Sequence, residues 1–253
     1  YVDRYLPPQG IDQIDEMLPS FEVTFPHLEH ADIEVPDEQL LAATQILCAS
    51  LREAVQLTEL MRYPPSWFHN FEFPAFIRDE EDGGFGPYVD SLGKVILAAA
   101  RLLRKLAADN SEQCADVVDA WLSPDPYIFD RLRLFAGRLE NGTTSTKLAE
   151  HLVSLSQQVF WDTFVERELM ETIISQWSDF SNQERWSIES RIWKFRVRFE
   201  WETEEEFAER KTYTVGRRLS LLNDIDTGLT EFGSERLAEI KRSNEWDDEF
   251  SKH

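Results

Sequence analysis

The chain has 253 residues, of which 42% are hydrophobic, and it contains eight Trp and 17 Phe. This is enough apolar material for a core, so the composition excludes a chain that is disordered throughout. The longest uninterrupted apolar stretch runs only from Val95 to Ala100, far short of the roughly 20 residues that span a bilayer, so we expect no membrane helix. Two Cys cannot build a disulfide framework, and nothing at the start resembles a signal peptide. We therefore expect a cytoplasmic protein.

The net charge is -22, from 48 acidic and 26 basic residues. Most of the imbalance lies in residues 1–90, which hold 18 acids and four bases. This charge repels phosphate backbones and anionic lipid, so we expect neither nucleic acid nor a membrane as a partner. The chain begins at Tyr1 and ends on the polar run Asn244–His253, which we interpret as a piece of a longer polypeptide.

Residues 1–36 are predicted to form an extended arm. They contain five Pro, and apolar residues alternate only at Phe21–Phe25 and Ile33–Val35, a pattern that favours extended chain over helix. A helical array is predicted for residues 37–253. Its first helix is predicted to have Asp37 as its cap and a buried stripe at three- and four-residue spacing, comprising Leu40, Leu41, Thr44, Leu47, Cys48, Leu51 and Val55.

Residues 62–90 interrupt the helical pattern with Pro, Gly pairs and eight aromatic residues. Loops of this length are uncommon in compact domains unless they are functional or disordered, and so many aromatic residues argue against disorder. One interpretation is that these side chains fill the space between two helices. The other is that they bind a partner, and the candidate residues are then Trp67, Phe68, Phe71, Phe73 and Phe76.

From Ser91 onward the helical period returns, with Asn141-Gly142 closing one helix. Consecutive helices joined by short turns predict an all-α fold, an irregular, solenoid-like array of stacked helix pairs, with an irregular bundle as the alternative. No fixed repeat length supports a regular repeat protein. The helices are predicted at 91–106, 111–122, 128–139, 145–160, 162–177, 182–195, 203–223 and 234–242.

Two segments contain residue types that bind metals. His27, Glu29, His30 and Asp32 could suit zinc, but in an extended segment positions i and i+3 face opposite sides, and the spacing is not that of a zinc-binding helix. The acidic run 79–82 before Gly83-Gly84 could attract calcium, but it lacks the alternating ligands of a calcium loop. We expect no metal ligand and no cofactor.

No motif predicts catalysis. The glycines at 83–86 match no phosphate-binding loop, and no His is framed as the base of a nucleophile. Cys48 and Cys114 lie in helical patterns, where we expect small buried hydrophobes. We therefore expect a noncatalytic protein. The alternatives are a helical enzyme domain with a carboxylate-bound divalent metal, and a purely structural spacer.

Charged residues near the two Trp at 193 and 201 form a local basic and aromatic patch. Its candidate partner-binding residues are Trp193, Arg196 and Arg198, and an acidic partner or the acidic first third of the chain would complement them. Other charged groups, on two predicted helices, are interpreted as structural salt links: Glu166, Arg167 and Glu168 on one, and Arg185, Glu189 and Arg191 on the next.

Several short motifs resemble the carboxy-terminal helical region of large bacterial anti-phage defence proteins, in which a sirtuin-like or STAND-type nucleotide-binding domain precedes a helical array. The resemblance implies a noncatalytic sensor, scaffold or oligomerisation segment whose partner is a protein or another domain of the same polypeptide. A homo-oligomer is also possible on this basis. The motifs are Phe160-Trp161-Asp162, Glu166-Arg167-Glu168-Leu169, Trp177, Glu184-Arg185, Ile188–Ile192, Phe73–Ile77 and Pro124-Asp125-Pro126 with Arg131-Leu132.

Overall fold

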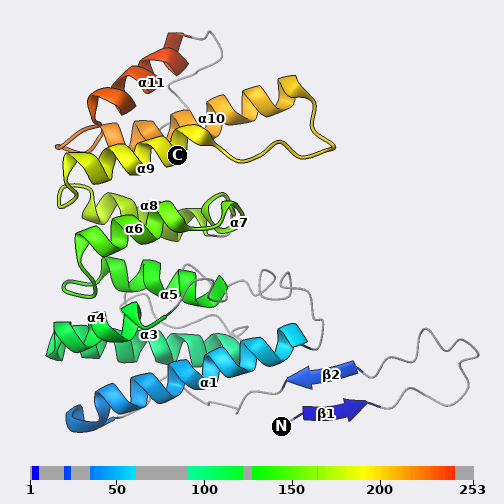
Figure 1. The fold of residues 1–253 in the computed structure, drawn as a ribbon, viewed down its shortest axis with the longest axis vertical. Helices are drawn as coiled ribbons and strands as arrows, with labels where there is room; N and C mark the ends of the chain where they lie inside the picture. Colours follow the sequence, from blue (N-terminus) through cyan, green and yellow to red (C-terminus); the bar gives the residue numbers. More distant parts are fainter. Residues whose placement is uncertain are drawn as a thin grey trace, which may run out of the picture. The chain divides into compact units, whose positions relative to one another are not determined.

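The computed structural model describes residues 2–5, 20–23, 35–60, 91–121, 127–163 and 165–242. These residues contain ten α-helices, a short 3-10 turn and a pair of strands (Figure 1). The predicted all-α class is thereby confirmed. The chain divides into two compact units, Tyr1–Ile128 and Phe129–His253. None of the described helices has both the length and the apolar character that a bilayer span requires.

The first unit opens with two short strands. β1 (Val2–Tyr5) pairs in antiparallel register with β2 (Ser20–Val23), so that Val2 lies opposite Val23. The first three residues of the alternation predicted at Phe21–Phe25 lie in β2, and the rest lies outside the described residues.

The first helix starts differently from the prediction. Asp37 does not cap it, because a 3-10 turn, η2 (Asp37–Gln39), precedes the helix and has Pro36 at its N-cap position. The carbonyl of Pro36 accepts the first bond of that turn from the backbone N–H of Gln39, at 2.9 Å. The backbone of Pro36 is extended, with φ -58° and ψ 144°, which suits a residue that leads into a helical turn without joining it. The helix itself, α1 (Leu40–Leu60), follows directly.

The core of the first unit is built by α1, α3 (Ser91–Asp109) and α4 (Ser111–Asp119), which pack against one another. Asn110 separates α3 from α4, and its side chain accepts a 3.1 Å hydrogen bond from the backbone N–H of Gln113. Cys48 and Cys114 are buried, as predicted. The apolar residues that recur at helical spacing after Ser91 are also buried in α3, at Val95, Ile96, Ala99, Leu102, Leu103 and Leu106.

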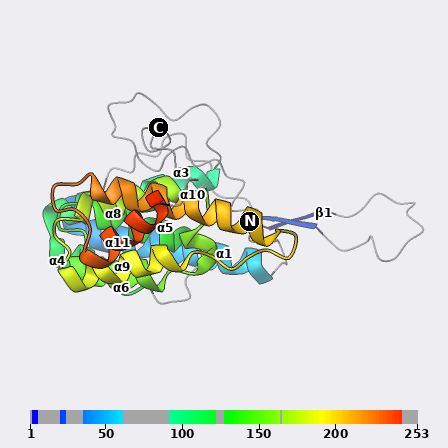
Figure 2. The same cartoon turned by 90° about the horizontal axis from the view of Figure 1, so that it is seen from above.

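The second unit stacks its helices in successive layers (Figure 1). In chain order they are α5 (Tyr127–Arg138), α6 (Ser145–Ser154), α7 (Gln157–Phe160), α8 (Glu166–Gln176), α9 (Asn182–Lys194), α10 (Glu204–Asn223) and α11 (Glu231–Arg242). In the view of Figure 2, α11 lies over α9 and α10, and it packs against both.

Local signals explain where the helices of this unit begin and end. Two begin with capping boxes, Ser181 with Glu184 and Thr203 with Glu206, which satisfy the free N–H groups of the first turn. Asn141 takes a left-handed conformation (φ 63°) after α5. A Cβ on the following residue, Gly142, would lie 2.1 Å from the carbonyl oxygen of Ala136, so only glycine fits there.

The helices predicted at 91–106 and 111–122 in the first unit end instead at Asp109 and Asp119. In the second unit, three predicted boundaries were wrong by more than one residue. The single helix predicted at 145–160 is broken into α6 and α7, because the Ser156 hydroxyl caps α7 by accepting from the backbone N–H of Val159 at 3.2 Å. α8 begins at Glu166 and not at 162. A non-helical connector that includes Trp161 lies between α7 and α8. α11 begins at Glu231 and not at 234, because the Thr230 carbonyl accepts the backbone N–H of Ser234 and completes an earlier turn.

The last described helix has one apolar and one polar side. Gly233, Leu237 and Ile240 are buried against the rest of the unit. The other side carries exposed residues that are mostly charged: Glu231, Ser234, Glu235, Ala238, Glu239, Lys241 and Arg242. Among the described residues, α11 therefore packs on its unit through a single face.

Candidate functional site

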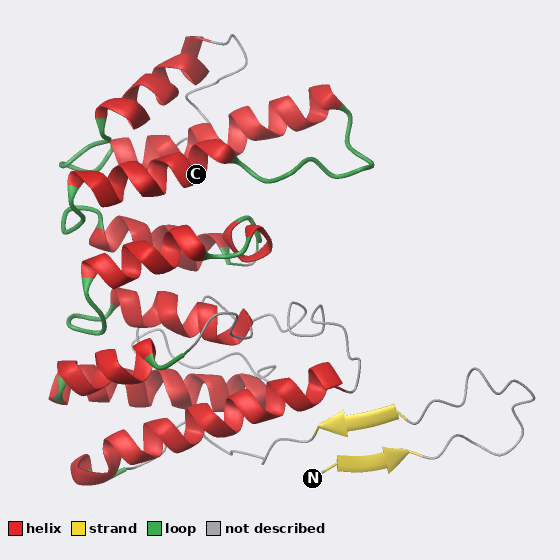
Figure 3. Cartoon of the chain, viewed as in Figure 1, coloured by secondary structure: helices red, strands yellow, loops and turns green. Residues whose placement is uncertain are grey.

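The segment Phe195–Thr203 joins α9 to α10 and is drawn as a long loop in Figure 3. Phe195 starts it with φ 51°, a value that costs free energy for a bulky residue. The buried Phe195 ring offsets this cost by packing on Trp161, with ring centroids 4.8 Å apart, and on Phe207 at 5.5 Å. The direction in which the chain leaves α9 is therefore fixed by a buried side chain.

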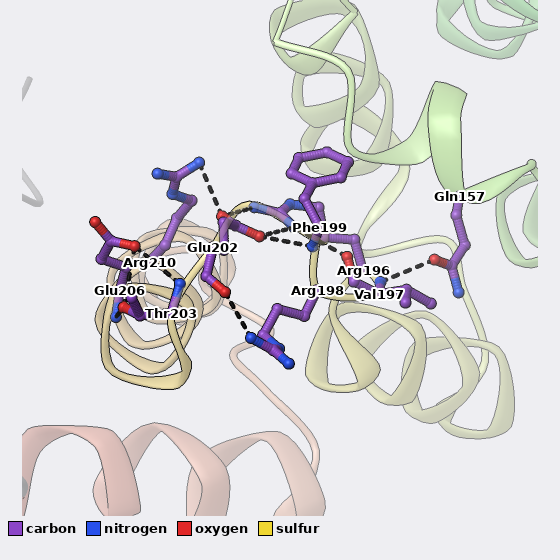
Figure 4. A network of polar contacts seen from close by, with 9 residues as sticks. All are labelled: Gln157, Arg196, Val197, Arg198, Phe199, Glu202, Thr203, Glu206 and Arg210. Carbon is purple, nitrogen blue, oxygen red and sulfur yellow. Dashed lines mark hydrogen bonds and ion pairs between the residues drawn. The ribbon is translucent and has the colours of Figure 1, made fainter.

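Glu202 is the centre of a network of polar contacts that holds this loop (Figure 4). Its side chain is fully buried, and its carboxylate accepts two hydrogen bonds from Arg196, at 2.5 and 2.7 Å. The same carboxylate accepts the backbone N–H of Phe199 at 2.9 Å and lies 3.1 Å from Nη1 of Arg210. The backbone carbonyl of Glu202 accepts from Nη1 of Arg198 at 2.5 Å. The buried carboxylate thus organises two arginines and the loop backbone, and the Glu202 carbonyl holds a third arginine.

The hydrogen bonds from Arg196 are also the main reason why the pKa of Glu202 is lowered to about 2. The backbone N–H of Phe199 and the charge of Arg210 lower this pKa further. Glu202 therefore remains ionised, and the loop keeps its anchor, throughout the physiological pH range.

The anchored loop exposes three apolar side chains, Val197, Phe199 and Trp201, which we name the aromatic platform. Their exposed fractions are 69%, 46% and 68%. The two rings stack, with centroids 5.4 Å apart and planes inclined by 20°. The guanidinium of Arg196 lies 3.9 Å from the Phe199 centroid, and that of Arg210 lies 5.6 Å from the Trp201 centroid. The two arginines that hold Glu202 therefore also hold the rings.

The structure brings some of the predicted binding residues together and separates others. Arg196 and Arg198 meet at Glu202, so both serve first to fix the loop. Trp193 instead has Lys211 at 4.9 Å and Arg236 at 5.0 Å from its ring centroid. The predicted aromatic candidates of the 62–90 insertion, Trp67, Phe68, Phe71, Phe73 and Phe76, lie outside the described residues.

The metal-like segments of the sequence, at 27–32 and 79–82, also lie outside the described residues. Within the part of the chain that the structure describes, no three His, Cys, Asp or Glu side chains are grouped closely enough to hold a metal ion.

The charged groups on α8 form salt links, as predicted. Arg131 on α5 donates two hydrogen bonds to Glu168, at 2.5 and 2.7 Å, and both side chains are buried. The exposed Arg167 pairs with Glu171 at 2.7 Å. Glu166 lies near Arg217 and Arg218 of α10.

The charged groups on α9 have other partners than those expected. The buried Glu189 accepts the backbone N–H groups of Thr230, at 2.8 Å, and Gly233, at 3.2 Å, and it also accepts the Thr230 hydroxyl. It therefore caps the start of α11. Arg191 donates to the Leu155 carbonyl at 3.1 Å, at the end of α6. Both residues attach neighbouring helices to α9.

Sequence reasoning missed Val197, Phe199, Glu202 and Arg210 as members of the site. One signal could have indicated them. From Phe195 to Trp201, apolar and charged residues alternate with a period of two over seven positions, a pattern that is typical of an extended segment and not of a helix terminus.

Comparisons of the sequence and the structure with protein-family models, with curated proteins and with solved structures find no match.

Proposed function

We propose that this chain is a noncatalytic interaction module, part of a larger cytoplasmic protein, and that it binds a protein segment through the aromatic platform. The supporting observation is that Phe199 and Trp201 are exposed and yet held in place by Arg196, Arg210 and Glu202. Trp and Arg dominate the binding energy of protein interfaces. Side chains that are already ordered lose little conformational entropy when a partner binds, so a fixed platform favours affinity.

The charges around the platform favour a partner of a particular chemistry. Arg196 and Arg210 are already paired with Glu202. Glu200, which lies between the two aromatic residues in the sequence, and Glu204, Glu205 and Glu206 in the first turn of α10 are exposed and add negative charge to this segment. We therefore no longer favour the acidic partner that the sequence predicted for this patch, and the partner that we propose is a segment with apolar side chains next to Lys or Arg.

The setting that we propose is bacterial anti-phage defence, with the module acting as a sensor or scaffold. The resemblance of motifs such as Phe160-Trp161-Asp162 and Glu184-Arg185 to the helical region of such proteins supports this setting. The partner segment would then belong to another protein or to another domain of the same polypeptide.

A peptide selection tests the proposal even when the natural partner is unidentified. Peptides that bind the full chain are selected from a random display library, and the selected peptides are then measured against the double variant Phe199→Ala, Trp201→Ala. The matched control is Trp186→Ala, because Trp186 is 45% exposed but lies on α9. We expect selected peptides to be enriched in apolar residues beside Lys or Arg.

Their affinity should fall by about tenfold or more for the double variant and stay unchanged for the control. Thermal unfolding should differ little between the variants, because the platform side chains are mostly exposed. Peptides that bind all three proteins equally, or no enrichment at all, would refute the platform as the binding surface.

A further inference from the structure

A second group of arginines in this unit is held much more loosely than the pairs described above. Glu166, the first residue of α8, has its Oε1 3.5 Å from Nη1 of Arg217 and 3.5 Å from Nε of Arg218. The Arg131–Glu168 and Arg196–Glu202 pairs, by contrast, have contacts of 2.5 Å. Strong charge-assisted hydrogen bonds lie near the shorter distance. Two arginines therefore share one carboxylate, and neither is tightly paired with it.

A third arginine approaches the same place from α9. The guanidinium of Arg191 lies 4.7 Å from the Phe160 ring centroid. That of Arg218 lies 5.3 Å from the same ring and 4.1 Å from the ring of Trp161. Burial is the main cause that lowers the pKa of Arg218 to about 10; the charges of Arg217 and Arg191 lower it further, and Glu166 opposes the shift. Arg218 is thus still charged at neutral pH.

Three donors in this group are buried and form no hydrogen bond: Nε of Arg191, Nε of Arg218 and the indole Nε1 of Trp161. Arg218 as a whole is 1% exposed. The structural roles of the two arginines use other atoms, since Nη1 of Arg218 donates to the Phe160 carbonyl and Nη2 of Arg191 to the Leu155 carbonyl. Buried donors without acceptors are costly and normally indicate a water or an ion.

We propose that Trp161, Arg191, Arg217 and Arg218 form a binding site for a small oxyanion, a phosphate or a carboxylate, which displaces the loosely held Glu166 carboxylate. Such a ligand supplies both features that the site needs, negative charge and acceptor oxygens, whereas a cation or a hydrogen-bond donor supplies neither. Entry is from the side of Arg217 and Glu166, whose side chains are 34% and 19% exposed. The site is separate from the aromatic platform and does not depend on the proposed function.

The test is a titration of the full chain with inorganic phosphate, and separately with acetate, at constant ionic strength. Calorimetry reports binding, and the intrinsic fluorescence, to which Trp161 contributes as one of eight Trp, is recorded in parallel. Arg218 is left unchanged in this experiment, because it is buried and its replacement could unfold the protein.

Two variants at the partly exposed positions should instead change the anion affinity in opposite directions. Glu166→Gln removes the competing carboxylate and should strengthen binding several-fold, while Arg217→Gln should weaken it about tenfold. The control is Arg167→Gln, an exposed arginine paired with Glu171, which should leave the affinity unchanged.

Saturable binding of either anion with this order of affinities supports the site, and the anion that binds more tightly identifies the ligand as a phosphate or a carboxylate. The proposal is overturned if neither anion binds saturably, if the three variants respond alike as they would to a general salt effect, or if Glu166→Gln binds no more tightly than the wild type.

Discussion

Glu202 and Arg196 form a bidentate pair in which the carboxylate is fully buried and the guanidinium is 11% exposed. Both residues lie in the same loop, only six positions apart in the sequence. The pair therefore fixes the local path of the chain more than it connects distant elements. The exposed Phe199 and Trp201 rings owe their positions to it, because the arginine that binds Glu202 also lies over Phe199.

Replacing the anchor should loosen the platform. In Glu202→Gln the shape is nearly kept, but one oxygen that accepts from Arg196 becomes an amide donor, so the bidentate pair is lost. We expect the affinity for selected platform peptides to fall about tenfold, with trypsin cleaving faster after Arg196 and Arg198. Limited proteolysis with mass spectrometry measures this. The control is Glu200→Gln, at an exposed position two residues away, and equal cleavage of both variants would contradict the anchoring role.

The helices could be predicted because their signals are local. Apolar spacing and the capping pairs Ser181–Glu184 and Thr203–Glu206 lie within one or two turns of the boundaries that they set. The break after α6 could not be predicted by spacing, since Leu152, Leu155 and Val159 are all buried at helical intervals across it.

The candidate site was harder to predict than the helices. Arg196 and Glu202 meet across an irregular loop, and Arg210 joins them from the first part of α10. No periodic rule relates these positions. The cap that Glu189 provides for α11 depends in the same way on how two helices pack, so the sequence indicated a charged residue but not its partner.

His151 should make stability depend on pH. Burial, and then the charge of Arg133, lower its pKa from 6.5 to about 4, although a contact with Asp130 opposes the shift. The unfolded chain then binds a proton that the folded chain does not, so stability is complete above about pH 6.5 and falls as the pH drops toward 4. We expect a loss of about 1 kcal/mol between about pH 7 and pH 5.5, measured by urea unfolding. His151→Gln should flatten this slope.

Glu202 provides an internal contrast to His151. Its lowered pKa means that its contribution to stability is complete above its ordinary pKa of 4.5 and is lost only as the pH falls toward 2. Mild acid should therefore weaken the fold around α6 while the platform still binds its peptides. An unchanged pH slope in the His151 variant would show that other groups cause the loss.

Gly233 should tolerate no side chain. A Cβ at this position would lie 2.6 Å from the carboxyl carbon of Glu189, which is buried and fixed by its bonds to the start of α11. Alanine favours a helix over glycine, so propensity alone predicts stabilisation. We expect the steric overlap with Glu189 to outweigh the gain in helix propensity, so that Gly233→Ala lowers the free energy of unfolding by about 1–3 kcal/mol. The neighbouring, exposed Ser234→Ala is the control, and it should change the stability by less than about 0.5 kcal/mol in chemical denaturation.

The thiols should be inert in the folded protein. Burial is the main cause that raises the pKa of Cys48 to about 12 and that of Cys114 to about 11. Since the thiolate is the reactive form, neither should react with a disulfide reagent at mildly alkaline pH until the first unit unfolds. Both should react fully in guanidinium chloride. Rapid labelling of one thiol in native buffer would mean that its helix opens locally.

The buried pair of Arg131 and Glu168 offers a double-mutant test of what holds α5 to α8. Glu168→Leu alone leaves a buried guanidinium beside an apolar side chain, and we expect a loss of about 3–5 kcal/mol in the free energy of unfolding. Arg131→Met combined with Glu168→Leu removes both charges and their desolvation costs, so most of that loss should be recovered. The hydroxyl of Thr172 on α8 lies 3.0 Å from the Leu134 carbonyl on α5, and this contact would still link the two helices in both variants. Urea unfolding of the two single variants and the double variant completes the cycle. A double variant as unstable as Glu168→Leu would mean that the ion pair itself stabilises this interface, and that the loss in Glu168→Leu does not come from burying the guanidinium without the Glu168 carboxylate.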